Sequence, residues 1–277
     1  EITQPKYWEN AVERFSAYLP NGPRPKYTPI ADGTELSKPT EAQIEKAKHL
    51  PYRQIVGVLQ YAAAYTKPVM KYVMSILSQF NGGWSTQHFA VALRALEYGY
   101  TSRHRGIIYS GRDPRGVNLL YAYGDSSFKP PLSQGGRVTM CNGGAVSSTS
   151  SKHKKTNTST AEAEAEEAFH ASTDVVALRY LAREIGVEQL DPTVIYCDNQ
   201  PAIQMMENKG SLAKRSKAMD TQLYALRDRM IDQEVQLQYV STAAMVADIF
   251  TKPLGRKKFE EFREMITGYA YVEHPSS

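Results

Sequence analysis

The fold of this chain is decided by the stretch from Thr193 to Gln200, which reads Thr-Val-Ile-Tyr-Cys-Asp-Asn-Gln. Its run of β-branched and aromatic residues is typical of a buried strand, and a helix is predicted to start at Pro201. The run ends on Asp198, with no Lys or Arg within eight residues on either side. A lone carboxylate at the end of a core strand is costly. We therefore expect either a hard cation shared with other acids or a purely structural role as the N-cap of the next helix.

Composition indicates a globular protein that is long enough for one large or two ordinary domains. The 277 residues are 42% hydrophobic, and 33 basic against 29 acidic side chains give a net charge of +4. This balance is compatible with a polyanionic partner without requiring one. Cys141 and Cys197 lie in strand-like runs without Cys-x-x-Cys spacing, so we expect reduced thiols of an intracellular protein.

The sequence shows neither a leader peptide nor an apolar run of the roughly eighteen residues that cross a bilayer. We therefore expect a soluble chain with no membrane contact. Its first residue is Glu1, which we interpret as a start inside a larger polypeptide.

The first part of the chain is predicted to be mainly helical. Apolar residues at helical spacing predict a helix over 5–17, and a polar connector rich in Pro, Gly, Lys and Thr follows to about residue 50. Three more helices are predicted over 52–65, 68–80 and 85–98. Their apolar faces can pack on one another, so residues 1–105 are predicted to form a small helical domain.

After residue 105 the hydrophobic period becomes that of strands, which predicts a second domain over 106–277. The predicted strands cover 106–109, 118–124, 136–141, 144–150, 193–198 and 235–240. The predicted helices cover 158–185, the segment from Pro201 to about residue 208, 217–232 and 245–266. This order of elements favours an α/β fold with a mixed sheet and flanking helices.

Four acids are predicted to converge at one end of this sheet. Asp125 and Asp198 end strands, Glu164 lies in the first turns of the long helix, and Asp248 begins the last predicted helix. Converging carboxylates repel one another unless a metal lies between them. Four of them suit two Mg²⁺ ions roughly 4 Å apart, one activating water and one stabilising the leaving 3′ oxygen of a phosphodiester.

Helical spacing selects Glu164 from its acidic neighbours. Steps of one helical turn from Glu164 lead along a small and apolar seam, which must face the sheet, whereas the same steps from Glu162 give a mixed face. Glu162, Glu166 and Glu167 are therefore interpreted as solvated residues of a helix N-terminus.

Several motifs resemble one family. The segments Ser159–Glu164, Ile195–Gln200, Tyr239–Thr242 and Ala247–Leu254 resemble the carboxyl-terminal part of copia-type (Pseudoviridae, Ty1/copia) LTR retrotransposon polyproteins. Upstream, Leu36–Pro39 and Pro51–Gly57 are similar to the thumb and connection region of the reverse transcriptase in the same polyproteins.

The resemblance implies an RNase H-like mixed five-stranded sheet from about residue 106, preceded by a thumb/connection-like helical region. It implies a ribonuclease H whose four metal ligands are Asp125, Glu164, Asp198 and Asp248, with Mg²⁺ as cofactor and Mn²⁺ as a substitute. The implied partners are an RNA/DNA hybrid and the polymerase part of the same polyprotein. The implied location is a cytoplasmic particle or the nucleus.

The chain also departs from the family. Gly124–Phe128 keeps one acid where the family has two, and Ala165 replaces an aromatic residue. Thr66–Val69, Lys217–Asp220 and the pair Ala243-Ala244 also differ from family motifs. No Tyr-x-Asp-Asp motif of a polymerase is present. The copy is therefore either diverged and active or degenerate and domesticated.

Two functions follow, and both use basic side chains. The predicted phosphate contacts are Lys152, Lys154, Lys155, Lys209, Lys214, Arg215 and Lys217, although a solvated surface charge is the preferred interpretation of any single lysine among them. A nuclease would cut the hybrid, whereas a domesticated module would bind nucleic acid or a protein partner without turnover. His153 and His170 are expected on the surface. A serine or nucleotide-dependent enzyme is set aside because its motifs are absent.

Overall fold

The stretch that ends on Asp198 forms β4 (Thr193–Cys197), inside a five-stranded sheet of order β3-β2-β1-β4-β5. The other strands are β1 (Leu120–Ser127), β2 (Gln134–Cys141), β3 (Gly144–Lys152) and β5 (Val235–Tyr239). β2 is antiparallel to both β1 and β3, whereas β4 is parallel to both β1 and β5. The mixed five-stranded sheet of an RNase H-like fold is therefore confirmed.

The protein is described by a computed structural model that covers residues 1–129, 131–207 and 217–272, without the side chains of 217–220. The described chain divides into two compact units. The helical unit consists of Glu1–Ile108 and Pro253–Tyr269. The sheet unit consists of Tyr109–Lys252 and the described residues after Tyr269.

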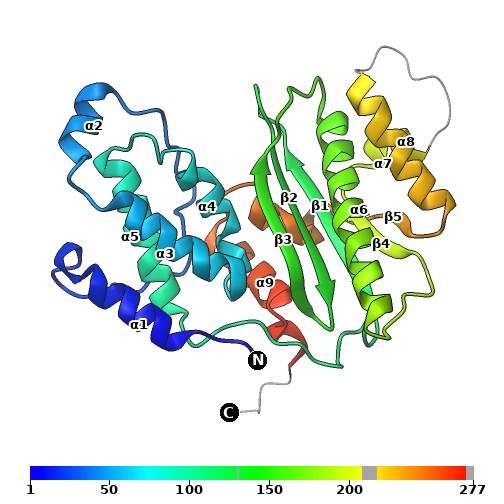
Figure 1. Cartoon of the computed structure of the whole chain (residues 1–277), viewed down its shortest axis with the longest axis horizontal. Coiled ribbons are helices and arrows are strands. Elements are labelled where there is room, and N and C mark those ends of the chain that lie inside the picture. Colours follow the sequence, from blue (N-terminus) through cyan, green and yellow to red (C-terminus); the bar gives the residue numbers. More distant parts are fainter. Residues whose placement is uncertain (130, 208–216, 273–277) are drawn as a thin grey trace. The chain divides into compact units, whose positions relative to one another are not determined.

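Helix α6 (Thr160–Glu184) packs along one face of the sheet (Figure 1). Ser159 caps its start, since Ser159 Oγ accepts a hydrogen bond from Glu162 N at 3.2 Å. The predicted seam is buried at Ala168, Ala171 and Val175, which together with Ala165 face Ala122, Ile195 and Cys197 of β1 and β4. These small side chains let the helix lie close to the sheet. The last two predicted members of the seam, Leu178 and Ala182, are only partly buried. Helices α7 (Gln200–Glu207) and α8 (Lys217–Ile231) complete this layer.

The hairpin between β2 and β3 turns at Asn142 and Gly143, whose φ angles are 49° and 79°. Asn-Gly is favoured in such tight turns because both residues tolerate positive φ. The turn sets the register that brings Gly144 opposite Cys141.

The helical unit contains α1 (Pro5–Arg14), α2 (Glu41–Ala47), α3 (Tyr52–Tyr65), α4 (Lys71–Ser78), α5 (Thr86–Thr101) and α9 (Arg256–Ile266). Trp8 is fully buried and lies against α5 at Gly99, where an added Cβ would come within 2.0 Å of the indole ring. Only glycine fits there. Among the described residues, no helix combines the length and the apolar composition that crossing a bilayer requires.

Three predicted elements differ from the structure. Helix α2 lies in the segment interpreted as a connector, and a capping box of Thr40 and Gln43 begins it. Residues 106–109 form no strand of the sheet; Ile107 makes only an isolated bridge to Ile2. The helix predicted over 245–266 is interrupted, because Pro253 and Gly255 separate a 3₁₀ turn from α9.

The 3₁₀ turns are η1 (Ser16–Tyr18), η2 (Pro68–Met70), η3 (Thr242–Ala244), η4 (Val246–Phe250) and η5 (Tyr269–Tyr271). Turn η4 packs against β1 and β2 within the sheet unit. It therefore brings the segment around Asp248 to the sheet.

Candidate metal centre

Three of the predicted acids meet at one end of the sheet. Tyr123 of β1 is paired with Tyr196 of β4 in a parallel ladder, so two residues further on Asp125 comes alongside Asp198. Glu164 arrives from the first turns of α6. Each of the three offers a carboxylate oxygen, and these oxygens lie within 4.8 Å of one another. We call Asp125, Glu164 and Asp198 the triad.

Burial and mutual repulsion make negative charge costly in the triad. Asp125 is 5% exposed and Glu164 is 3% exposed. Burial, followed by the charge of Asp248, raises the pKa of Asp125 to about 7. Burial, followed by the charges of Asp125 and Asp198, raises the pKa of Glu164 well above its ordinary value. A bound cation would relieve both effects.

The donor set of the triad fits a divalent cation. Glu164 Oε1 accepts a hydrogen bond from Ser126 N at 3.2 Å. Its other oxygen, Oε2, is buried and has no hydrogen-bond partner among the described residues. Buried carboxylate oxygens left without a donor are costly unless a cation uses them. Oxygen ligands of this kind are those that Mg²⁺, Mn²⁺ and Ca²⁺ prefer.

Asp248 lies beside the triad but is engaged differently. It sits in η4, is 1% exposed, and forms an ion pair in which Lys252 Nζ lies 2.6 Å from Asp248 Oδ1. Thr251, three residues after Asp248, donates from Oγ1 to Asp125 Oδ2 at 2.6 Å. The structure thus gathers three of the four predicted ligands, and the role of Asp248 as the fourth stays a prediction.

Thr251 and Lys252 were not singled out by the sequence. Both lie in the Ala247–Leu254 motif, three and four residues after Asp248. This is the spacing at which side chains share one side of a helical turn, so the signal was present.

The structure contradicts the prediction that His153, Glu166 and Glu167 lie in solvent. Their exposed fractions are 4%, 5% and 0%. Asn157 Nδ2 lies 2.8 Å from His153 Nδ1, and His153 Nε2 lies 3.1 Å from Glu167 Oε2. Glu166 lies between two histidines, with Oε2 3.4 Å from His153 Nδ1.

Glu167 can be buried because a basic residue on β2 pairs with it. Arg137 Nη1 donates to Glu167 Oε1 at 2.9 Å, and Arg137 Nε donates to Asp174 Oδ2 at 2.6 Å. A charge can leave water when it is both paired and hydrogen-bonded. His170, predicted on the surface, has a side chain that is 38% exposed and lies 3.8 Å from Glu166 Oε1.

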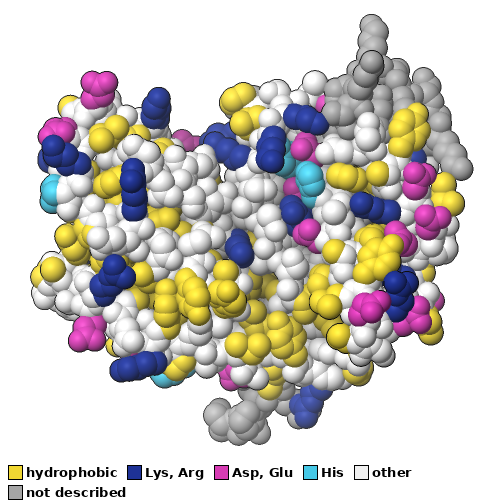
Figure 2. All heavy atoms as spheres, viewed as in Figure 1, with side chains coloured by type: hydrophobic (Ala, Val, Ile, Leu, Met, Phe, Trp, Pro, Cys, Tyr) yellow, Lys and Arg dark blue, Asp and Glu magenta, His cyan; other side chains and the backbone are white. Residues whose placement is uncertain are grey.

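The predicted phosphate contacts are only partly described. Lys152, Lys154 and Lys155 are exposed at the end of β3 and in the segment leading to α6. Lys209, Lys214, Arg215 and the side chain of Lys217 lie outside the described residues. On the face seen in Figure 2, the described Lys and Arg side chains are dispersed rather than gathered into one patch.

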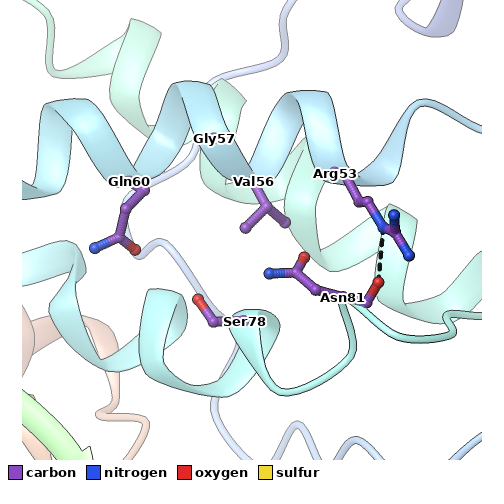
Figure 3. A pocket seen from close by; sticks show the side chains of 6 residues that line it. All are labelled: Arg53, Val56, Gly57, Gln60, Ser78 and Asn81. Carbon is purple, nitrogen blue, oxygen red and sulfur yellow. Dashed lines mark hydrogen bonds between the residues drawn. The ribbon is translucent and has the colours of Figure 1, made fainter.

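A separate groove of about 500 Å³ lies in the helical unit, between α3 and the end of α4 (Figure 3). Its lining is Arg53, Val56, Gly57, Gln60, Ser78 and Asn81. Arg53 Nε donates to Asn81 O at 2.7 Å across one end. Its lining contains no carboxylate, so it offers no site of the triad's kind.

No family model matches the chain. Its relatives include the Retrovirus-related Pol polyprotein from transposon TNT 1-94 of Nicotiana tabacum, which is 30% identical over 274 residues, and that from transposon RE1 of Arabidopsis thaliana, which is 31% identical over 262 residues. A Truncated transposon Ty1-A Gag-Pol polyprotein of Saccharomyces cerevisiae is 24% identical over 237 residues.

These alignments cover 96%, 93% and 83% of this chain but only 20%, 17% and 19% of the relatives. The chain thus spans about a fifth of the length of the relatives it matches.

Solved structures match it in part. A foamy viral protease-reverse transcriptase in complex with dsDNA has a TM-score of 0.40 and 18% identity over 74% of this chain and 42% of that one. LC11-RNase H1 has a TM-score of 0.38 and 13% identity over 52% of this chain and 98% of that one.

Proposed function

Because the homologues of this chain are Pol polyproteins of copia- and Ty1-type transposons, we propose that it is the ribonuclease H part of such a polyprotein. It cuts the RNA strand of RNA/DNA hybrids by metal-dependent phosphodiester hydrolysis. Residues 106–277 supply the RNase H-like domain, and residues 1–105 supply a thumb and connection region that adjoins the polymerase. It acts inside the cell, in a retrotransposon particle or in the nucleus.

The observation that carries this proposal is the triad. Three carboxylates from β1, α6 and the end of β4 approach within 4.8 Å, and Glu164 Oε2 lacks a partner among the described residues. Sequence relatives alone would be equally consistent with a module that binds without cutting. The burial and mutual repulsion of Asp125 and Glu164 in this cluster support catalysis, because electrostatic strain of this kind is typical of functional sites.

Each residue of the site has a proposed part. Asp125, Glu164 and Asp198 hold the metal, and Asp248 completes the set for two ions, with Mg²⁺ preferred and Mn²⁺ as a substitute. Ions bound there would supply an activated water and would stabilise the leaving 3′ oxygen. Ser126 N and Thr251 Oγ1 orient Glu164 and Asp125.

Binding of the hybrid uses backbone contacts. The exposed Lys152, Lys154 and Lys155 meet phosphates, which gives affinity that falls with salt and reads no base sequence. Recognition of RNA in one strand requires contacts to its 2′-hydroxyls.

Cleavage of an RNA/DNA hybrid labelled on the RNA strand tests the proposal. With Mg²⁺ present, the parent chain cuts the RNA strand, and excess EDTA stops it. Glu164→Gln removes the charge at the centre of the triad and abolishes cutting, while hybrid binding, followed by fluorescence anisotropy, persists. Glu162→Gln is the matched control on the same helix, because Glu162 bonds to Thr158; it cuts like the parent.

Equal cutting by Glu164→Gln and the parent would refute the assignment. Tight binding by a parent chain that never cuts would instead establish the domesticated binding module.

A further inference from the structure

One of the four acids already has a cation of its own. The Lys252 ammonium lies 2.6 Å from Asp248 Oδ1; the Asp248 side chain is 1% exposed and that of Lys252 is 43% exposed. Lys252 N also donates to Asp248 O at 3.2 Å, so the pair closes a short turn. The carboxylate is buried, whereas the ammonium keeps a path to water.

The triad differs in this respect. Among the described residues, none of its three carboxylates forms an ion pair, and its recorded hydrogen-bond donors are neutral: Ser126 N to Glu164 and Thr251 Oγ1 to Asp125. The four acids therefore form two classes. The three acids of the triad can share an ion directly, whereas Asp248 must first lose its ion pair with Lys252.

The lysine also lies close enough to act on the triad. The charge of Asp248 raises the pKa of Asp125, and the charge of Lys252 lowers it. An ion shared by Asp125 and Asp248 would meet the ammonium in the same space, and a divalent cation and an ammonium repel each other strongly away from bulk water.

We propose that Lys252 is the resident counter-ion of the metal-free site and that it makes the two metal positions unequal. An ion held by the triad binds with Lys252 in place. An ion that uses Asp248 binds only when the ammonium swings out to solvent, so it binds more weakly. Lys252 is thus a positioning residue that sets the concentration at which the second ion enters. The inference rests on the proposed function and deepens it.

Mn²⁺ binding to the whole chain tests this without any turnover. The electron paramagnetic resonance signal of free Mn²⁺ gives the number of bound ions and their affinities at fixed ionic strength. The parent chain is expected to bind two ions, the second about tenfold or more weakly than the first. Lys252→Met should tighten the second ion about tenfold and leave the first unchanged, whereas Lys252→Arg keeps the charge and the weak second ion.

Two further variants fix the interpretation. Asp248→Asn should lose the second ion and keep the first. Arg183→Met removes one positive charge from the far end of α6, roughly 28 Å along the helix from Glu164, and should behave as the parent. In metal-free buffer, Lys252→Met should melt at a lower temperature than the parent, because buried Asp248 has lost its counter-ion, and saturating Mn²⁺ should remove this difference.

A lower melting temperature for Lys252→Met with an unchanged second affinity would show a merely structural ion pair and overturn the proposal. Identical isotherms for the parent and Lys252→Met would do the same while leaving hybrid cleavage intact. A parent chain that binds no Mn²⁺ and cuts no hybrid would overturn the proposed function itself.

Discussion

Replacing Arg137 by Met is the sharpest test of how the sheet unit is held together. Arg137 pairs with Glu167, whose side chain is 0% exposed, and with Asp174, whose side chain is 28% exposed. Removing one partner of a buried pair leaves an uncompensated charge and costs about 3–5 kcal/mol. The partly exposed Asp174 pair adds at most about 1 kcal/mol. The expected loss is therefore a large share of the roughly 5–15 kcal/mol that stabilises an ordinary domain.

Urea denaturation at neutral pH measures this loss. Asp174→Asn is the matched control, because it removes only the partly exposed acid and should cost about 1 kcal/mol or less. The double variant Arg137→Met/Glu167→Gln should be more stable than Arg137→Met alone, since the buried charge is then gone. A loss below about 1 kcal/mol for Arg137→Met, or a double variant no better than the single one, would refute the reasoning.

Two other predictions concern the same unit and its neighbour. The pKa of Asp125 is raised to about 7, so folding favours the protonated form of this carboxyl group. The free energy of unfolding of the metal-free chain should therefore fall as the pH rises from about 4 to 7. Denaturation curves at several pH values should show a smaller fall for Asp125→Asn. A methyl group at Gly135 would lie 2.0 Å from Glu167 Oε2 and 2.5 Å from His153 Nε2, whereas one at Gly57 in α3 meets nothing within 4 Å. Gly135→Ala should cost about 1–3 kcal/mol and Gly57→Ala should gain up to about 1 kcal/mol; equal effects of the two would contradict the described packing.

The elements that carry their signal locally were predicted well. Strand β4 and its terminal Asp198 follow from a run of β-branched residues and the helix start beside it. The inward direction of Glu164 follows from the seam of alanines on α6, and the structure places it in the triad. Both features depend on residues that lie close together in the sequence.

Features that depend on distant partners were missed. Glu167 looks like a solvated helix acid until Arg137, thirty residues earlier, is placed opposite it by the β2 register. His153 is buried because its two ring nitrogens lie by Glu167, fourteen residues later, and by Asn157. Pro253 and Gly255 indicate a break before α9, but the helical spacing of apolar residues on either side favoured one continuous helix.

Helix α9 has a topological consequence. Its apolar residues Phe259, Phe262 and Ile266 are buried in the helical unit, where Phe259 lies edge-on to Tyr98 at 5.6 Å. The polypeptide crosses from the helices to the sheet near Ile108 and returns at Pro253, so no single cut yields two intact halves. In a fragment that begins after residue 105, these three side chains of α9 would lose the partners that bury them and would be exposed to water. Proteolytic release of either unit should therefore yield aggregation-prone pieces.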